Sequence, residues 1–223
     1  MIYTLVEGHG EVEAIGNLLH RLRKHLELPY ETIASPRRWP KIHTDKGLET
    51  VCNLIRNFGN CTGLLILKDE DDNCPVEVVP SKVRLLQSLN LPFPVGYVLL
   101  YREYETLLLA SLDSLKGKKI KDKSGFLRDG ISSAANLERD LEKIRNAKGM
   151  LSSFFPKNKI YKPKLDQLPL TRMIDFDLIR ESGLPCYGTL ERCLIDMNSN
   201  KGKSSIYPRI CLLYTSPSPR DRG

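Results

Sequence analysis

The first hundred residues alternate short apolar runs with amphipathic stretches, and this alternation constrains the fold more than any other feature of the sequence. The expected strands are 2–6, 31–34, 64–67 and 95–101, and helices are expected after residue 10 and from about 46 and 80. Strands that alternate with single helices are typical of βαβ units, whose strands run parallel. We therefore predict an α/β fold with a parallel four-stranded sheet flanked by helices.

The character of the sequence changes after residue 112. The segment LKGKKIKDKSG at 115–125 is rich in lysine, and the later apolar periodicities at 134–145, 170–181 and 187–197 indicate helices without a further strand. We place a boundary near residue 115. Residues 1–115 are then the α/β core, and residues 116–210 form a basic loop and a C-terminal helical cap.

The last thirteen residues, 211–223, resemble the in-frame translation of a sequencing adapter joined to a gene fragment. Such a segment is set aside in reasoning about the fold. We expect it to pack against nothing, because a sequence of this origin was never selected to complement a core.

Composition and charge limit the class of protein. Hydrophobic residues make up 41% of the chain and charged residues 27%, which allows a sizeable buried core. No apolar run approaches the roughly 18 residues of a membrane span, and the first residues carry no export signal, so we expect a cytoplasmic protein without a membrane partner. The six cysteines form no CxxC pair and are expected to be reduced. The net charge of +7 suits a polyanionic partner such as nucleic acid.

Acidic residues follow three of the four expected strands. They are Glu7 and Glu11, Asp69 and Asp71, and Glu103 and Glu105. An acid at the end of one buried strand is most often a solvated turn residue, but the carboxyl ends of parallel strands share one crevice, and here three strands end alike. We predict that the first four acids are catalytic and that all six are candidate metal ligands.

A cluster of carboxylates at one edge of a sheet requires cations. Asp69 and Asp71 stand two residues apart, so on an extended strand end they point the same way. Two like charges about 4 Å apart repel by about 4 kcal/mol at an effective dielectric constant near 20. Oxygen ligands alone select hard ions, Mg²⁺ or Mn²⁺, so the pattern predicts phosphoryl transfer or phosphodiester cleavage.

Three other site motifs fail. The calcium-loop pattern around DEDDNCP has Cys74 in place of the turn glycine and Pro80 in place of the final glutamate. The dinucleotide-binding pattern has Glu13 at its third glycine position, and the P-loop pattern before KGKS has Met197 at its first.

Glycines and basic residues supply candidate phosphate contacts. The glycine turn after the first strand lets the backbone approach a phosphate, and the stretch RRWPK at 37–41 can pair phosphates and stack a base. An ordinary basic loop explains the stretch equally well, and the lysines of 116–123 are most often a solvated loop. The predicted phosphate- or nucleic-acid-binding residues are Gly8, His9, Gly10, Arg37, Arg38, Trp39, Lys41 and Lys148.

Two motifs together resemble a known signature. LVEGHGE at 5–11 with LILKDED at 65–71 resembles the Toprim signature of primases, topoisomerases and OLD-family nucleases. VEGHGEVEAIGNLLHRL, YREYETLLLAS, RNAKGML and YKPKLDQLPLTRMIDFDLIRES are similar to the pattern of an uncharacterised bacterial family called domain of unknown function 4276. The resemblance covers about residues 2–197.

The resemblance implies a Toprim-like sheet and roles for the acids. Glu7 matches the motif glutamate, Glu11 the additional acid of the OLD-like branch, Asp69 with Asp71 the D-x-D pair, and EYE at 103–105 the E-x-E position. The dipeptide TL at 106–107 departs from the expected alanine and tryptophan. The family also implies association with a separately encoded ATPase, but no settled activity.

These observations lead to two main hypotheses. The first is a divalent-metal-dependent, nuclease-like phosphodiesterase that acts on DNA or RNA, as the effector partner of an ATPase in phage defence. The second is a non-catalytic nucleic-acid-binding or adaptor module of the Toprim kind, and a third, weaker one is hydrolysis of a small phosphoester. The sequence leaves open the choice of DNA or RNA, endo- or exonucleolytic action, and the oligomeric state.

Overall fold

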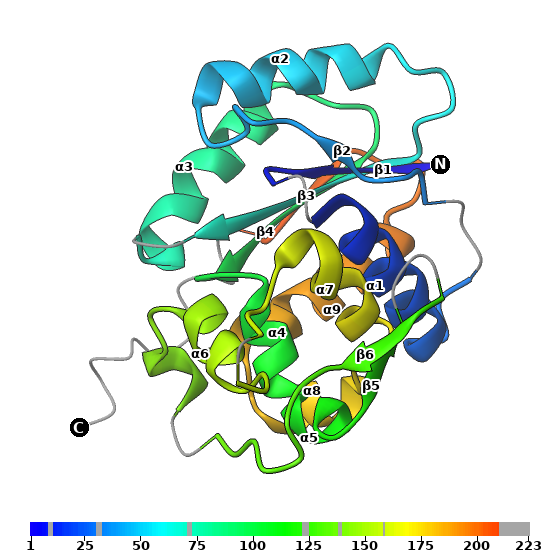
Figure 1. Cartoon of the computed structure of the whole chain (residues 1–223). Helices are drawn as coiled ribbons and strands as arrows, with labels where there is room; N and C mark the ends of the chain where they lie inside the picture. Colours follow the sequence, from blue (N-terminus) through cyan, green and yellow to red (C-terminus); the bar gives the residue numbers. More distant parts are fainter. Residues whose placement is uncertain are drawn as a thin grey trace.

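The structure is a computed structural model of the chain, and it describes residues 1–8, 11–29, 33–70, 73–121, 125–137, 140–157 and 159–209. These residues form a five-stranded parallel sheet with helices on both faces, together with a small two-stranded antiparallel sheet (Figure 1). The predicted α/β class with a parallel sheet flanked by helices is confirmed.

The main sheet has the strand order β2-β1-β3-β4-β7, and every pairing in it is parallel. Its strands are β1 (Ile2–Val6), β2 (Arg37–Arg38), β3 (Gly63–Glu70), β4 (Pro94–Tyr101) and β7 (Ser205–Tyr207). Leu5 lies opposite Ile66, and Ile66 lies opposite Tyr97. Parallel pairing brings the carboxyl ends of β1, β3 and β4 to one edge.

The predicted number of strands is wrong, because the described residues contribute five strands to the sheet. The fifth, β7, comes from the range predicted as a helical cap. Of the predicted strand at 31–34, residues 31 and 32 lie outside the described ranges, and Ile33 makes a single parallel bridge to Ile2. The described strand that pairs with the end of β1 is β2, a few residues later. Both β2 and β7 are short edge strands, which need no long apolar run.

Helices lie on both faces of the sheet, as Figure 1 shows. On one face lie α1 (Glu11–His25) and α9 (Pro185–Ser199), and on the other lie α2 (Asp45–Arg56) and α3 (Pro75–Ser88). The apolar residues of α1 that recur at helical spacing, among them Ile15, Leu18 and Leu22, are buried. The periodicity places one apolar stripe against the core and leaves Lys24 in the last turn exposed, whereas Arg23 beside it is buried.

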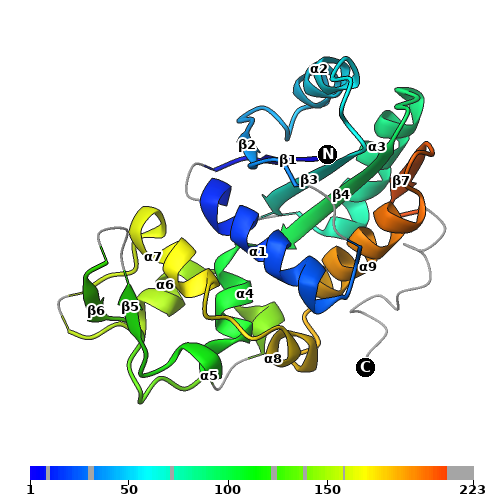
Figure 2. The same cartoon turned by 90° about the vertical axis from the view of Figure 1, so that its right-hand side faces the viewer.

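The remaining elements lie beyond α1 and the carboxyl edge (Figure 2). They are α4 (Glu105–Ala110), α5 (Leu112–Leu115), α6 (Ala147–Ser153), α7 (Pro163–Thr171), α8 (Phe176–Glu181), a 3-10 turn (Leu141–Lys143) and the hairpin of β5 (Lys119–Lys121) and β6 (Leu127–Asp129). None of the described helices combines the length and the apolar character that crossing a membrane requires.

Several predicted elements after residue 112 need correction. The described part of 134–145 contains a 3-10 turn and no α-helix, and the predicted helix at 170–181 is the end of α7 followed by the separate α8. The expectation of no further strand is wrong as well, since β5, β6 and β7 follow. The helix predicted at 187–197 is confirmed as part of α9.

Two apolar clusters fill the two faces of the sheet. The cluster under α2 and α3 includes Leu5, Ile66 and Tyr97. The other begins at the opposite face of the sheet and continues through Tyr104 into α7, α8 and α9, where Leu190 belongs to it. Residues before and after the predicted boundary at 115 therefore share one core.

Candidate functional site

The predicted acids lie at the point in the sheet where the order of the strands changes direction. From β1 the chain crosses to β2 on one side, whereas from β3 it crosses to β4 on the other. The switch point of the sheet, where open α/β sheets form their ligand crevices, therefore lies between β1 and β3. Glu7 directly follows β1, and Asp69 is the second-last residue of β3. Both acids therefore lie at the switch point between these two strands.

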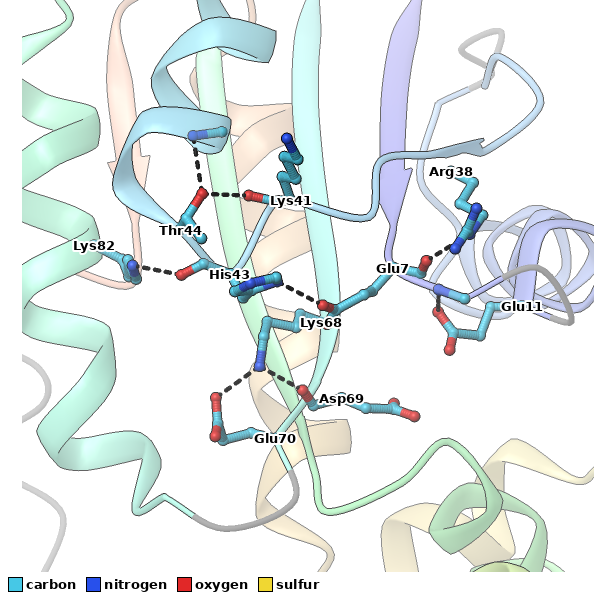
Figure 3. A network of polar contacts seen from close by, with 12 residues as sticks. Glu7, Glu11, Arg38, Lys41, His43, Thr44, Lys68, Asp69, Glu70 and Lys82 are labelled. Carbon is cyan, nitrogen blue, oxygen red and sulfur yellow. Dashed lines mark hydrogen bonds and ion pairs between the residues drawn. The ribbon is translucent and has the colours of Figure 1, made fainter.

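The pleat of the strands divides these acids between two faces, because successive residues point to opposite sides. Leu65 and Leu67 belong to the cluster on the α1 side, so Asp69 continues that face, whereas Glu70 continues the α2 face. Figure 3 shows the Asp69 side chain pointing away from Glu70. We call Glu11, Asp69, Glu103, Glu105 and Lys148 the α1-side group, and Glu7, His43, Lys68, Glu70 and Lys82 the α2-side network.

In the α2-side network, Glu7 is held by residues of the segment that leads into α2. Its Oε1 lies 2.9 Å from His43 Nδ1, and Arg38 Nε donates to its carbonyl oxygen at 3.0 Å. Lys82 from α3 donates to the carbonyl of His43 at 2.8 Å (Figure 3). It also pairs with Asp45 at 2.5 Å. The carboxylate of Glu7 is thus directed toward a histidine and away from Asp69.

A second pair in the same network joins Lys68 and Glu70. Lys68 Nζ donates to Glu70 Oε2 at 2.9 Å and to the carbonyl of Asp69 at 2.8 Å, and the Asn73 amide donates to Glu70 Oε1 at 2.7 Å. Burial raises the pKa of Glu70, but the bonds from Lys68 and Asn73 outweigh it and the pKa lies below its ordinary value. Sequence reasoning missed Lys68, although its position two residues before Glu70 in a strand places both on one face.

On the α1 side, the turn after β1 folds the Glu11 carboxylate back over the backbone. The Gly8 N–H donates to Glu11 Oε2 at 3.2 Å, and a Cβ at residue 8 would lie 2.5 Å from Oε1. Only glycine therefore permits this position of Glu11. Burial raises the pKa of Glu11, the Gly8 bond opposes it, and the charge of Glu7 raises it further. The Gly8 amide, predicted as a phosphate donor, is engaged by the chain's own carboxylate.

Lys148 is the cation within the α1-side group. Its backbone N–H donates to Glu103 Oε2 at 2.8 Å, and its Nζ lies 3.5 Å from Glu103 Oε1. Burial lowers the pKa of Lys148, yet the charges of Glu105 and Glu103, with a contribution from Asp69, raise it above its ordinary value. Burial also raises the pKa of Glu105, which Lys148 and the Tyr161 hydroxyl lower only in part.

Two buried tyrosines, Tyr104 and Tyr161, border this group and were not predicted. Burial is the first cause that raises the pKa of each, and the charges of Glu105 and Asp69 add to it in both cases. The Tyr104 hydroxyl also lies 2.7 Å from Thr171 Oγ1. These residues give the acids a neighbourhood of low polarity, where electrostatic interactions are stronger than in water.

The basic stretch before α2 is only partly available to a ligand. Arg37, Arg38 and Lys41 are exposed, and the Arg37 guanidinium lies 6.0 Å from the centroid of the Tyr3 ring. Trp39, however, is half-buried, packs against the cluster under α2 and α3, and donates its indole N–H to Gly47 O at 3.2 Å. The stretch thus presents cations at the edge of the sheet, while its aromatic ring belongs to the core.

Three predicted site residues, His9, Gly10 and Asp71, lie outside the described residues, as does the segment 211–223. Among the residues that the structure does describe, no three His, Cys, Asp or Glu side chains could together hold a metal ion. Mg²⁺, however, is commonly bound by one or two carboxylates, with waters and substrate phosphate completing its shell. Glu11 and Asp69 offer carboxylate oxygens, which are the donors that a hard divalent ion takes in this mode.

Comparisons of the chain with protein-family models, with curated proteins and with solved structures gave no match.

Proposed function

We propose that this chain is a divalent-metal-dependent phosphodiester hydrolase of the Toprim kind that acts on nucleic acid. The observation that supports this best is the position of the acids: Glu7 and Asp69 end adjacent parallel strands at the switch point of the sheet, with Glu11 beside them. A crevice at a switch point is where α/β sheets bind ligands, and carboxylates are the ligands that Mg²⁺ and Mn²⁺ prefer.

The proposal gives the residues of the α1 side different tasks. Glu11 and Asp69 would hold the ion, which when bound would lower the pKa of an attacking water and neutralise charge on the phosphate. Burial raises the pKa of Glu105, which favours its protonated form, the form that a general acid requires. Lys148 of the α1-side group and the exposed Arg38, whose Nε donates to the Glu7 carbonyl at the end of β1, would pair with phosphate oxygens.

The finer parts of the proposal concern architecture and partners. Helices α4 to α8 would form the cap of a Toprim-like core, whereas α9 and β7 belong with the sheet, where β7 pairs with β4. The separately encoded ATPase partner follows from the resemblance to the uncharacterised family, and both this partner and the cytoplasmic location expected from the sequence are part of the proposal.

One observation favours the second hypothesis, a non-catalytic nucleic-acid-binding module. Glu7, Glu70 and Glu103 each pair with a basic side chain, namely His43, Lys68 and Lys148. At Glu70 and Glu103 a lysine therefore offsets the repulsion between neighbouring carboxylates without a metal ion. A module that keeps such pairs for stability would bind nucleic acid without cleaving it.

Cleavage of labelled plasmid and RNA by the purified chain, in Mg²⁺, Mn²⁺ or EDTA, tests the proposal. Asp69→Asn keeps the side-chain volume and removes one negative charge, so metal affinity and cleavage should fall together by at least about tenfold. Asp113→Asn, at an exposed position on α5, is the matched control and should leave both unchanged. Equal Mn²⁺ affinity of wild type and Asp69→Asn in calorimetry would remove Asp69 from the site.

Gly8→Ala provides a second test that changes no charge. The added Cβ would displace the Glu11 carboxylate from its position over the turn, so metal affinity should fall although every acid is retained. Gly59→Ala, where a Cβ would meet no atom within 4 Å, is its control. Metal binding that is unaffected by Gly8→Ala would exclude Glu11 as a ligand and favour the non-catalytic module.

A further inference from the structure

Two segments that are distant in the sequence carry the excess of positive charge. Residues 116–130 and 156–166 together contain ten lysines and arginines and three aspartates, an excess of seven, which equals the net charge of the whole chain. The first segment includes the hairpin of β5 and β6, and the second leads into α7. We call the described residues of these two segments the basic lobe.

The two segments form one surface, because polar contacts join them. Lys159 Nζ lies 3.1 Å from Asp129 Oδ2, and the Arg128 guanidinium donates to Leu165 O at 3.2 Å and pairs with the Asp166 carboxylate. Asp166 is fully buried, so this pair fixes the hairpin to the first turn of α7. Figure 2 shows β5 and β6 beside α7, at the far side of α1 from the sheet.

Large apolar side chains stand exposed on this charged surface. Phe126 is 77% exposed, Leu127 64%, Ile160 65% and Leu165 56%, and these are four of the seven most exposed large apolar residues in the described part of the chain. The exposed lysines of the lobe include Lys118, Lys121, Lys157, Lys162 and Lys164. A lysine-rich loop that is only solvated has no need of apolar groups, whereas a surface that combines the two is typical of a binding site.

The basic lobe also adjoins the acids of the α1-side group. Tyr161 follows the exposed Ile160 directly, yet it is buried, and after this burial the charge of the Glu105 carboxyl is the next cause that raises the pKa of its hydroxyl. One short stretch of chain thus runs from the exposed apolar surface to the site described above. A polymer bound along the lobe would extend toward the α1-side group.

We propose that the basic lobe binds single-stranded nucleic acid, with its lysines on the phosphates and Phe126 and its apolar neighbours against the bases. This inference rests on the proposed function and specifies its substrate. In a single strand the faces of the bases are available for stacking on aromatic side chains, whereas in a duplex they are stacked on one another. Exposed apolar groups between cations therefore match a single strand better than a duplex.

Binding in EDTA tests the inference independently of catalysis. Fluorescence anisotropy at several salt concentrations would use labelled single strands of about 20 nucleotides, both DNA and RNA, and a duplex of the same sequence. The double variant Lys121→Glu/Lys164→Glu should bind the single strand at least about tenfold more weakly, with a salt slope reduced by about 1.4, because two phosphate contacts are lost. Lys201→Glu/Lys203→Glu, also exposed, is the matched control and should stay within about twofold of wild type.

The apolar part of the lobe has its own variant. Phe126→Ala should weaken binding of the single strand by about tenfold and leave the salt slope unchanged, since it removes stacking and no charge. Leu54→Ala, an exposed apolar position on α2, is the control and should have no effect. Circular dichroism melts of every variant check that the fold is retained.

Several outcomes would overturn the inference. The inference is wrong if the lobe variants bind the single strand as tightly as wild type, or if the control variants lose as much affinity as the lobe variants. It is also wrong if the chain binds the duplex more tightly than the single strand, or if it binds vesicles of anionic phospholipid but not nucleic acid. Lobe-dependent binding without cleavage in Mg²⁺ or Mn²⁺ would contradict the proposed function alone. Cleavage that does not depend on the lobe would contradict this inference alone.

Discussion

Glu105 is the buried carboxyl group of the α1-side group, with 2% of its surface exposed. Burial raises its pKa, and the nearby Lys148 and Tyr161 offset this only in part. A carboxyl group whose pKa is higher in the folded than in the unfolded state binds its proton more tightly in the folded state. The stability that Glu105 contributes through this difference is therefore fully present at pH values below its pKa in the unfolded state. It is lost as the pH rises through its pKa in the folded state.

Glu105→Gln should accordingly stabilise the chain at high pH and not at low pH. Glutamine keeps the shape of the protonated acid, so in EDTA the variant should exceed wild type in unfolding free energy by on the order of 1 kcal/mol near pH 8. The difference should vanish below about pH 4, where the acid is protonated in both states. Urea unfolding at several pH values measures this, and a variant that is less stable than wild type near pH 8 would contradict it.

At the scale of single residues, the two-residue period of a strand predicted the side of β3 to which Asp69 points, but it could not predict the partners of the acids. β3 extends to Glu70, three residues beyond the predicted end at 67, so Asp69 and Glu70 lie in the strand and face opposite sides. The partner of Glu7, His43, is 36 residues away and comes from a loop, where no periodicity indicates proximity. Whether Asp71 shares the site stays a prediction, because it lies outside the described residues.

At the scale of elements, α9 packs against β4 at a point where the strand has no side chain. A Cβ on Gly96 would collide with Cys193 Sγ and would lie 3.0 Å from Leu65 Cδ1 and 3.1 Å from Met197 Sδ. Interiors are packed about as densely as organic crystals, so one additional methyl group here has no free volume to occupy. Gly96 thus sets how closely the helix approaches the sheet.

Gly96→Ala should destabilise the chain by about 1–3 kcal/mol, because α9 must move away from β4. Cys193→Ala should recover part of this loss in the double variant, which gives a coupling energy of about 1 kcal/mol in a double-mutant cycle. Gly59→Ala, in open space, is the control. Urea unfolding of wild type, the two single variants and the double variant measures the cycle. If the two changes in unfolding free energy simply add, the collision with Cys193 does not determine how closely α9 approaches β4.

The elements that the sequence predicted well are those with a long apolar pattern. In α1 and α2 the repeating apolar residues bury one face of each helix, and in β3 and β4 continuous apolar runs fill the centre of the sheet. The strands β2 and β7 could not be predicted in this way, because two or three residues at an edge carry no periodicity and obtain their conformation from pairing with a neighbour. The basic hairpin escaped prediction for the same reason.

At the scale of the whole molecule, the helices beyond the carboxyl edge are joined to the sheet by more than the chain. Arg21 of α1 donates to Thr171 O at 2.5 Å and to Ile174 O at 2.7 Å, and its guanidinium lies 5.0 Å from the centroid of the Phe176 ring. The same apolar cluster contains Val98 of β4 and Leu190 of α9. The face of the sheet that α1 covers is therefore completed by segments from the second half of the sequence.

This shared core predicts that the fragment 1–115 does not fold alone. Without α7, α8 and α9, the α1-side face of β4 and part of α1 would be exposed to water. Each large apolar side chain left exposed costs about 1.5–3 kcal/mol. The summed cost of a few such side chains exceeds the free energy of unfolding of a typical domain. Residues 1–209 should unfold in one cooperative transition, with coincident near- and far-ultraviolet circular dichroism melts, whereas the fragment should lack near-ultraviolet signal and bind a hydrophobic dye. The boundary near 115 would then separate two halves of one folding unit. A fragment 1–115 with a cooperative melt of its own, or two separate transitions in 1–209, would show instead that the sheet and the helices beyond it fold as independent domains.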